Sequence, residues 1–193
     1  MGLLLIVATL LQEGYVLDKD ASVFTAKVEV GGLLSAFGHD HTVAMRDLSG
    51  EARFDPEKVE GSLRMTIRTA SIVEIGREFS EQDRQEITRE IHDKALEVSK
   101  HPEIAFQSQS VSGRKVGEGE FQVLIRGRLT LHGVTRPVSI PARLLLEGGR
   151  LTARGTFTVR HSDYGIERLS AAAGTVKAKD EILLTFHIVT RKP

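Results

Sequence analysis

The chain has 193 residues, and its 26 basic side chains (Lys and Arg) balance its 26 acidic ones (Asp and Glu). A chain of this length fits one domain with a sizeable core. The zero net charge argues against a broad nucleic-acid footprint and gives no electrostatic reason to sit on an anionic membrane. Cysteine is absent, which excludes a disulfide framework, a thiolate nucleophile and a cysteine metal site.

An apolar run, GLLLIVATLL, occupies residues 2–11. It is too short to cross a bilayer, so we expect no stable membrane span. It resembles the hydrophobic region of a secretory signal, although no basic residue precedes it and no clear cleavage site follows; a buried first strand or helix is the alternative. We predict that residues 1–14 form a signal peptide or apolar N-terminal segment, that residues 15–193 form the folded domain, and that the protein is periplasmic or secreted.

Alternation of apolar and polar residues, which is typical of half-buried strands, recurs along most of the chain. It is clear at residues 23–30, 51–54, 63–68, 104–108, 121–131, 151–159 and 176–188. Each of these segments has one apolar face that must be covered.

The period changes between residues 78 and 99, where Ile87, Ile91 and Ala95 fall at i, i+4 and i+8. Ser80 is followed by acidic residues and fits an N-terminal helix cap. This pattern predicts one amphipathic helix packed across a barrel, rather than a helix that binds a partner.

About eight short strands and a single helix predict an all-β, mainly antiparallel fold, either a closed sheet or a sandwich. One helix cannot cover so much apolar surface, whereas closure lets the apolar faces meet inside. We therefore predict an extended β-barrel of about eight strands with one amphipathic helix. A barrel of this size just holds a ligand.

The segment 127–146, GRLTLHGVTRPVSIPARLLL, reads as a β-hairpin. Gly133 suits the turn because glycine adopts backbone angles that other residues avoid. Pro137 and Pro141 cannot donate to a ladder, so they indicate an edge, a bulge or a strand end.

Within this hairpin, LTLHGVTRPV resembles the signature hairpin of the YceI-like family, the lipocalin-shaped polyisoprenoid-binding proteins. Residues 15–18 (YVLD), 101–106 (HPEIAF) and 162–166 (SDYGI) resemble three further family segments in the expected order. His161 departs from the pattern, since an Arg commonly stands there. The resemblance implies a lipocalin-like barrel with a helix against one opening, which captures a long isoprenoid or similar amphiphilic lipid such as a polyprenol or quinone.

Metal binding or catalysis on the face shared by His39 and His41 is the alternative function. On a strand these two imidazoles point the same way, but a zinc site needs at least three protein ligands, and His132 and His161 are the remaining partners considered. A nucleophile elbow and a phosphate-binding loop are both missing from the sequence. We therefore predict no catalytic residue, no enzyme activity and no required metal or cofactor.

The candidate site residues follow from the barrel hypothesis. We expect the lumen to be lined by apolar side chains that bury the alkyl part of the ligand: Phe24, Val28, Phe37, Val43, Met65, Ile67, Phe106, Leu131, Phe157 and Phe186. The candidates for a head-group contact are His39, His41, His161 and Asp163. A third hypothesis is a structural barrel with a filled interior, in which these apolar residues are ordinary core. The expected partner is a hydrophobic small molecule, not nucleic acid, and a homodimer stays open.

Overall fold

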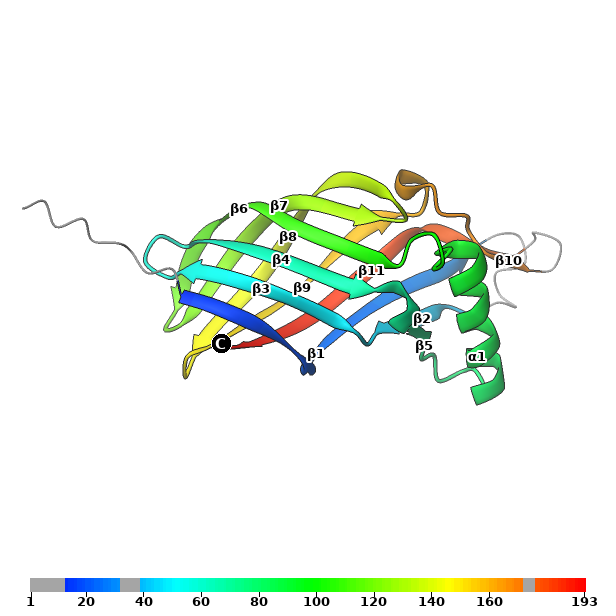
Figure 1. Cartoon of the computed structure of the whole chain (residues 1–193), viewed down its shortest axis with the longest axis horizontal. Coiled ribbons are helices and arrows are strands. Elements are labelled where there is room, and N and C mark those ends of the chain that lie inside the picture. The colour runs from blue at the N-terminus through cyan, green and yellow to red at the C-terminus, as the bar shows by residue number, and fades with distance from the viewer. Residues whose placement is uncertain (1–12, 32–38, 172–175) are drawn as a thin grey trace, which may run out of the picture.

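The chain is built almost wholly of strands, with a short helical segment in the middle (Figure 1). This computed structural model describes residues 13–31, 39–171 and 176–193. The strands are β1 (Glu13–Gly31), β2 (His41–Met45), β3 (Leu48–Asp55), β4 (Glu60–Arg68), β5 (Ile72–Glu74), β6 (Glu103–Gly117), β7 (Glu120–Leu131), β8 (Val134–Glu147), β9 (Arg150–Arg160), β10 (Ser170–Ala171) and β11 (Val176–Arg191). The helical elements are η2 (Thr69–Ser71), α1 (Glu81–Glu90), η3 (Ile91–Ala95) and η4 (Ser162–Tyr164).

Eight of the strands form a closed antiparallel barrel, which confirms the predicted fold class. Around the barrel the order is β1, β3, β4, β6, β7, β8, β9, β11, and β11 pairs back with β1. The closing ladder runs from Val16 opposite Arg191 to Gly31 opposite Lys177. Closure removes the free sheet edges and directs the apolar faces of all eight strands inward.

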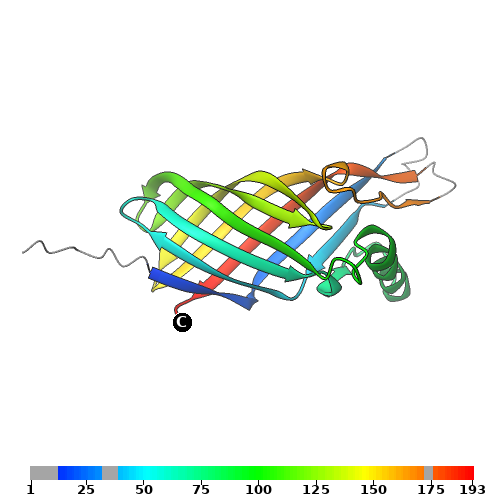
Figure 2. The same cartoon turned by 45° about the horizontal axis from the view of Figure 1, so that its top comes forward.

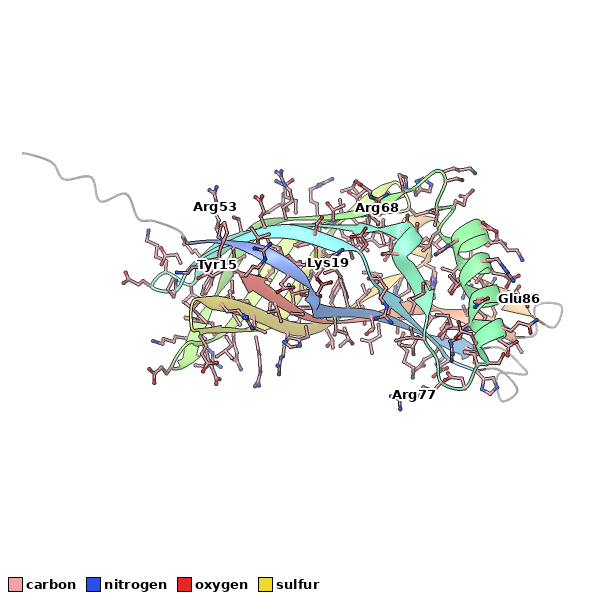
Figure 3. All side chains as sticks on the ribbon, turned by 60° about the horizontal axis from the view of Figure 1, so that its bottom comes forward. Tyr15, Lys19, Arg53, Arg68, Arg77 and Glu86 are labelled. Carbon is pink, nitrogen blue, oxygen red and sulfur yellow. The ribbon has the colours of Figure 1, made fainter. Side chains whose placement is uncertain are left out.

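The two ends of the barrel differ. At one end β2 pairs with the second half of β1, β5 pairs with β2, and α1 lies across the opening, as both views show (Figure 1, Figure 2). We call this the helix end. The C-terminus lies at the opposite end. Charged side chains such as Arg68 on β4 and Glu86 on α1 are exposed on the outer surface (Figure 3).

The predicted helix begins as expected. The Ser80 hydroxyl accepts a hydrogen bond from the Asp83 backbone N–H, and the Asp83 carboxylate accepts one from the Ser80 N–H, which is a complete capping box. The regular α-helix ends at Glu90 and continues as the π-helical turn η3, closed by Leu96 N–H donating to Ile91 O. Within the described ranges, no helix is long and apolar enough to cross a membrane.

The opposite end of the barrel is filled by aromatic side chains. Tyr15, Phe54 and Phe121 are almost completely buried. The rings of Phe54 and Phe121 meet edge to face, with centroids 5.0 Å apart. This packing closes that end of the barrel from within.

The β7–β8 hairpin has a two-residue turn, His132-Gly133, and both residues have positive φ, as a tight hairpin turn requires. Strand β8 pairs with β7 from Val134 to Leu145, but its ladder with β9 covers only residues 143–147. Pro137 and Pro141 lie beyond that ladder, where β8 is paired on one side only, so of an edge, a bulge or a strand end their setting is nearest to an edge. We call the stretch where residues 137–142 of β8 face 155–160 of β9 the β8–β9 seam.

Two inward-facing glycines lie under two aromatic rings. A Cβ at Gly127 would come within 2.6 Å of Phe106 Cζ, and a Cβ at Gly155 within 2.7 Å of Phe186 Cζ. The rings of Phe106 and Phe186 therefore lie directly against the barrel wall. They occupy the space that a side chain at Gly127 or Gly155 would take. Lying against the wall, they leave the middle of the barrel less obstructed.

We expect Gly155→Ala to destabilise the barrel by about 1–3 kcal/mol, because the added methyl meets both the Phe186 ring and Pro141 O. Urea unfolding followed by circular dichroism measures this. Gly117→Ala on β6 is the matched control, since the nearest atom to a Cβ there, Glu120 Cβ, lies at an ordinary contact distance of 3.4 Å. Equal free energies of unfolding for the two variants would contradict the close packing of ring on glycine.

Candidate functional site

An apolar cavity of about 230 Å³ lies inside the barrel. A single water needs about 10–15 Å³ on the same measure. Side chains from all eight barrel strands line it, and the lining is almost wholly aliphatic and aromatic. The interior is therefore not filled by side chains, contrary to the hypothesis of a solid structural barrel.

Most of the predicted lumen residues border this cavity. Those that do are Phe24, Val28, Val43, Met65, Ile67, Phe106, Leu131, Phe157 and Phe186. Phe37 lies outside the described residues. Further lining residues that we did not single out include Ile125, Leu129, Ile140, Leu144, Ile182 and Leu184. The same strand alternation that identified the first set would have identified these.

The helix end of the cavity is covered by a lid segment, residues 81–95, made of α1 and η3. Ile87 and Ile91 are half-buried there and border the cavity together with Ala95. The lid segment is held to β5 by two hydrogen bonds. The Glu74 N–H donates to Thr88 Oγ1 at 3.0 Å, and His92 Nε2 lies 2.7 Å from Ile72 O. The carbonyl can only accept, so Nε2 carries the proton.

The rings of His39 and His41 both contact the ring of Phe79. The His41 ring stacks on Phe79 with centroids 5.2 Å apart, and the His39 ring meets the same Phe79 edge to face at 5.7 Å. His41 borders the cavity, whereas His39 precedes β2 and is exposed. Within the described part of the chain, neither belongs to a group of three potential metal ligands.

The buried carboxylate of Glu74 lies beneath the lid segment, and it was not among the residues predicted from the sequence. One oxygen accepts N–H groups from Thr42, Ile75 and Gly76 at 3.1, 3.0 and 2.7 Å, and the other lies 3.1 Å from His41 Nδ1. Burial alone would raise the pKa of Glu74, but the hydrogen bonds from His41, Gly76 and Thr42 outweigh it, so the pKa lies below its usual range. Glu74 thereby stays ionised and ties β2 and β5 together under α1.

His161 also borders the cavity and is 8% exposed. Its Nδ1 lies 3.0 Å from Asp180 O and must donate, because a carbonyl only accepts. Burial lowers the pKa of His161 and so favours the neutral ring, in which Nε2 is an acceptor. Among the head-group candidates, His41 and His161 thus share the cavity.

Asp163 does not share the cavity with them. It lies in the short helix η4 and is exposed, and its backbone carbonyl accepts a hydrogen bond from Arg136 Nε at 3.1 Å. Asp163 was predicted as a head-group candidate together with His39, His41 and His161. The turn at η4 instead buries His161 and Tyr164 and leaves Asp163 facing solvent.

A closed antiparallel barrel with an apolar cavity and a helix across one end defines the class of small, lipocalin-like cavity proteins. The family model of the YceI-like domain matches residues 15–190, and the chain belongs to this family. The resemblance found in the four sequence motifs is therefore confirmed.

Relatives and solved structures agree with this assignment. A UPF0312 protein of Pseudomonas syringae pv. tomato is 29% identical over 185 residues, which cover 92% of this chain and 87% of the relative. One from Ectopseudomonas mendocina is 34% identical over 143 residues, 68% of each chain. Burkholderia cenocepacia BcnA has the same fold, with a TM-score of 0.68, 21% identity, and coverage of 90% of this chain and 98% of that one. A polyisoprenoid binding domain from Saccharophagus degradans also has this fold, with a TM-score of 0.64 and 18% identity. The match covers 93% of this chain and 98% of that one.

We expect acid to destabilise the protein through His161. Because burial lowers its pKa in the folded state, the unfolded chain binds the proton more tightly, and the free energy of unfolding falls as the pH drops below about 6.5. His161→Asn removes this titration and keeps an N–H donor for Asp180 O. Urea unfolding of both proteins at a series of pH values measures the difference.

The stability advantage of the wild type over His161→Asn should therefore shrink between about pH 7.5 and pH 5. Comparing the two proteins cancels the contributions of the other histidines. An advantage that stays constant over this range would show that His161 is not buried in its neutral form.

Proposed function

We propose that this protein binds a long isoprenoid, or a similar amphiphilic lipid such as a polyprenol or quinone, inside the barrel. The observation that carries this proposal is the apolar cavity, whose lining reaches from Phe54 near the filled end to Leu96 beside the lid segment. Apolar surface of this kind stabilises an alkyl chain by about 0.8 kcal/mol per buried methylene. A chain-shaped ligand matches a space lined along the barrel by eight strands.

The named neighbours support the proposal. One structure of the same fold is described as a polyisoprenoid binding domain. Its 18% identity supports the barrel shape rather than the particular ligand.

The arrangement of polar groups favours one orientation of the ligand. His41 and His161 border the cavity at the helix end, while the opposite end is packed with Tyr15, Phe54 and Phe121. A hydroxyl or carbonyl head group fits beside the two histidines, and the tail then extends toward the aromatic end. Neutral His161 offers Nε2 as an acceptor for an alcohol O–H.

We propose a carrier or store rather than an enzyme. The two cavity histidines are already engaged, His41 with Glu74 and His161 with Asp180 O, and they border an apolar space. Such fixed imidazoles suit recognition of a head group. We also propose that the protein acts in the periplasm or outside the cell, with residues 1–14 as the segment that directs its export. Residues 1–12 lie outside the described residues.

Affinity for isoprenoid alcohols should rise with chain length and then level off. Each isoprene unit adds five carbons and so at most about 4 kcal/mol of transfer free energy, reduced by the cost of ordering the chain. Levelling marks the length at which the chain fills the cavity. A fluorescence or calorimetric titration with alcohols of increasing length measures this on the wild type.

Phe157→Asp should weaken long alcohols more than short ones, because it puts a charge on the cavity wall. Thr158→Asp is the matched control on the same strand, since Thr158 is exposed on the outer face. Changing His41 or His161 should alter head-group preference and leave the length dependence largely intact. Affinity that ignores chain length in a folded protein would remove the lipid-binding proposal.

Export predicts a trimmed chain. Protein isolated from its native host should begin near Tyr15, because the apolar run precedes the segment that resembles the family's opening strand. Intact-mass spectrometry of the periplasmic or secreted fraction measures this. An untrimmed chain in the cytosolic fraction would contradict the proposed location without affecting the binding proposal.

A further inference from the structure

Three potential metal ligands meet beside the lid segment, outside the cavity lining. They are Glu97, which follows η3, His101, which precedes β6, and His132 in the β7–β8 turn. One ligand atom from each lies within 4.8 Å of the other two, and all three side chains are partly buried. We call them the Glu97–His101–His132 cluster.

The hydrogen bonds of His132 show what the cluster lacks. Its Nδ1 lies 3.3 Å from Tyr164 O, and its Nε2 lies 3.1 Å from Glu97 Oε2. A carbonyl and an ionised carboxylate both accept only, so a neutral imidazole with one proton satisfies one contact and not the other. Either a second proton or a metal ion between Nε2 and the carboxylate completes the arrangement.

The contact between His132 Nδ1 and Tyr164 O is of the kind that orients a histidine for metal binding. Metal-binding histidines usually donate their second ring N–H to a carbonyl or carboxylate, which fixes the tautomer and the ring orientation. With Nδ1–H donating to Tyr164 O, the lone pair on Nε2 points toward Glu97. His132 is thus preset to bind a metal through Nε2.

The chain also fixes the other two ligands. Glu97 O accepts the backbone N–H groups of Lys100 and His101, so one tight turn carries both Glu97 and His101. The His101 ring lies on Gly133, where a Cβ would come within 2.9 Å of His101 Cε1, and its centroid is 4.2 Å from that of His132. Any larger residue at 133 would push His101 out of the cluster.

Backbone strain is concentrated at the same place. In the described ranges, the non-glycine residues with positive φ are Val59, Glu97 and His132, and two of these three belong to the cluster. Such conformations are costly and persist mainly where the surrounding structure or a function requires them.

We propose that Glu97, His101 and His132 form a binding site for a divalent transition metal, of which Zn²⁺ is the best match. Two imidazoles and one carboxylate are a frequent zinc ligand set, with a water or an external ligand in the fourth position. Bonds of about 2.0–2.2 Å separate tetrahedral ligands by about 3.3–3.6 Å, and small side-chain rotations reach these separations from the present spacing. The partial exposure of all three side chains gives the ion a path from solvent.

Lys100 sets the strength of the site. Its ammonium binds Glu97 Oε1 and leaves Oε2, the oxygen near His132 Nε2, for the metal. The same positive charge opposes a cation, so the site should be of moderate affinity. Lys100 is largely exposed and loses little by turning away.

Binding a metal would stiffen one corner of the lid. Glu97 directly follows Leu96, which borders the cavity just after the lid segment, while His132 lies in the turn between two barrel strands. An ion between them links the residues that follow the lid segment to the β7–β8 turn. Since the barrel is already closed by its strand ladders, the metal reinforces the lid and is not needed for folding.

The test is calorimetric titration of the whole protein with Zn²⁺, together with Co²⁺ absorption spectra. Glu97→Gln, His101→Gln and His132→Asn should each weaken Zn²⁺ binding by at least about 10-fold. Asn suits the positive φ of residue 132, so His132→Asn keeps the turn. His187→Asn, on β11 outside the cluster, is the matched control and should leave the affinity unchanged. Lys100→Gln should strengthen binding.

Nitrogen NMR of the imidazoles supplies a second readout. On adding Zn²⁺, His132 Nε2 should shift while Nδ1 keeps its proton, and amide exchange of residues 91–101 should slow. The proposal fails if the wild type binds no Zn²⁺, or if binding survives Glu97→Gln and His132→Asn in folded protein. It also fails if His132 carries two protons at neutral pH and Zn²⁺ does not displace one, or if His41→Asn abolishes binding instead.

Discussion

The pairing of β1 with β11 is the constraint on which the rest of the structure depends. Each of the eight barrel strands has an apolar face. The pairing closes the sheet into a barrel, so that these faces point toward one another in the interior. No second layer is then needed, which is why one half-buried helix suffices. The eight-strand circumference leaves more room than the inward side chains fill, and Gly127 and Gly155 add to it by letting Phe106 and Phe186 lie against the wall.

The same barrel treats its two ends differently. The opposite end is sealed by tightly packed aromatic rings, whereas the helix end is covered by a segment held through polar contacts to β5. Ile87 and Ile91 are only half-buried, so the lid segment gains less from apolar burial than the barrel strands do. Local opening should therefore begin at the lid, next to the cavity histidines.

Much of the fold followed from periodicity alone. Alternation identified the inward faces, the capping residue Ser80 fixed the start of the helix, and the prolines marked a strand edge. Periodicity could not tell whether the lumen was filled, because a packed core and a cavity wall have the same pattern. The cavity depends on where rings such as Phe106 settle, which in turn depends on a glycine on the next strand.

The polar sites were harder to predict, because they join residues far apart in the sequence. The spacing of His39 and His41 indicated a shared face, but it gave no sign that both rings contact Phe79. Nothing in the sequence distinguishes Glu74 from other acidic residues. Its role follows from three backbone N–H donors, which only the folded chain brings to its carboxylate. His132 and Glu97 are 35 positions apart and meet only because the lid ends beside the β7–β8 turn.

The β8–β9 seam has a mechanical consequence. Where a continuous ladder of hydrogen bonds joins two barrel strands, a change in the girth of the barrel must break or shift that ladder. Along residues 137–142 of β8 there is no ladder with β9 to break, and the prolines prevent those positions from forming one readily. Together with other short ladders, such as those of β1 with β3 and of β4 with β6, the seam gives the barrel places where fewer hydrogen bonds join neighbouring strands. The internal width of the barrel can therefore adjust at these places at a lower cost than along its continuous ladders.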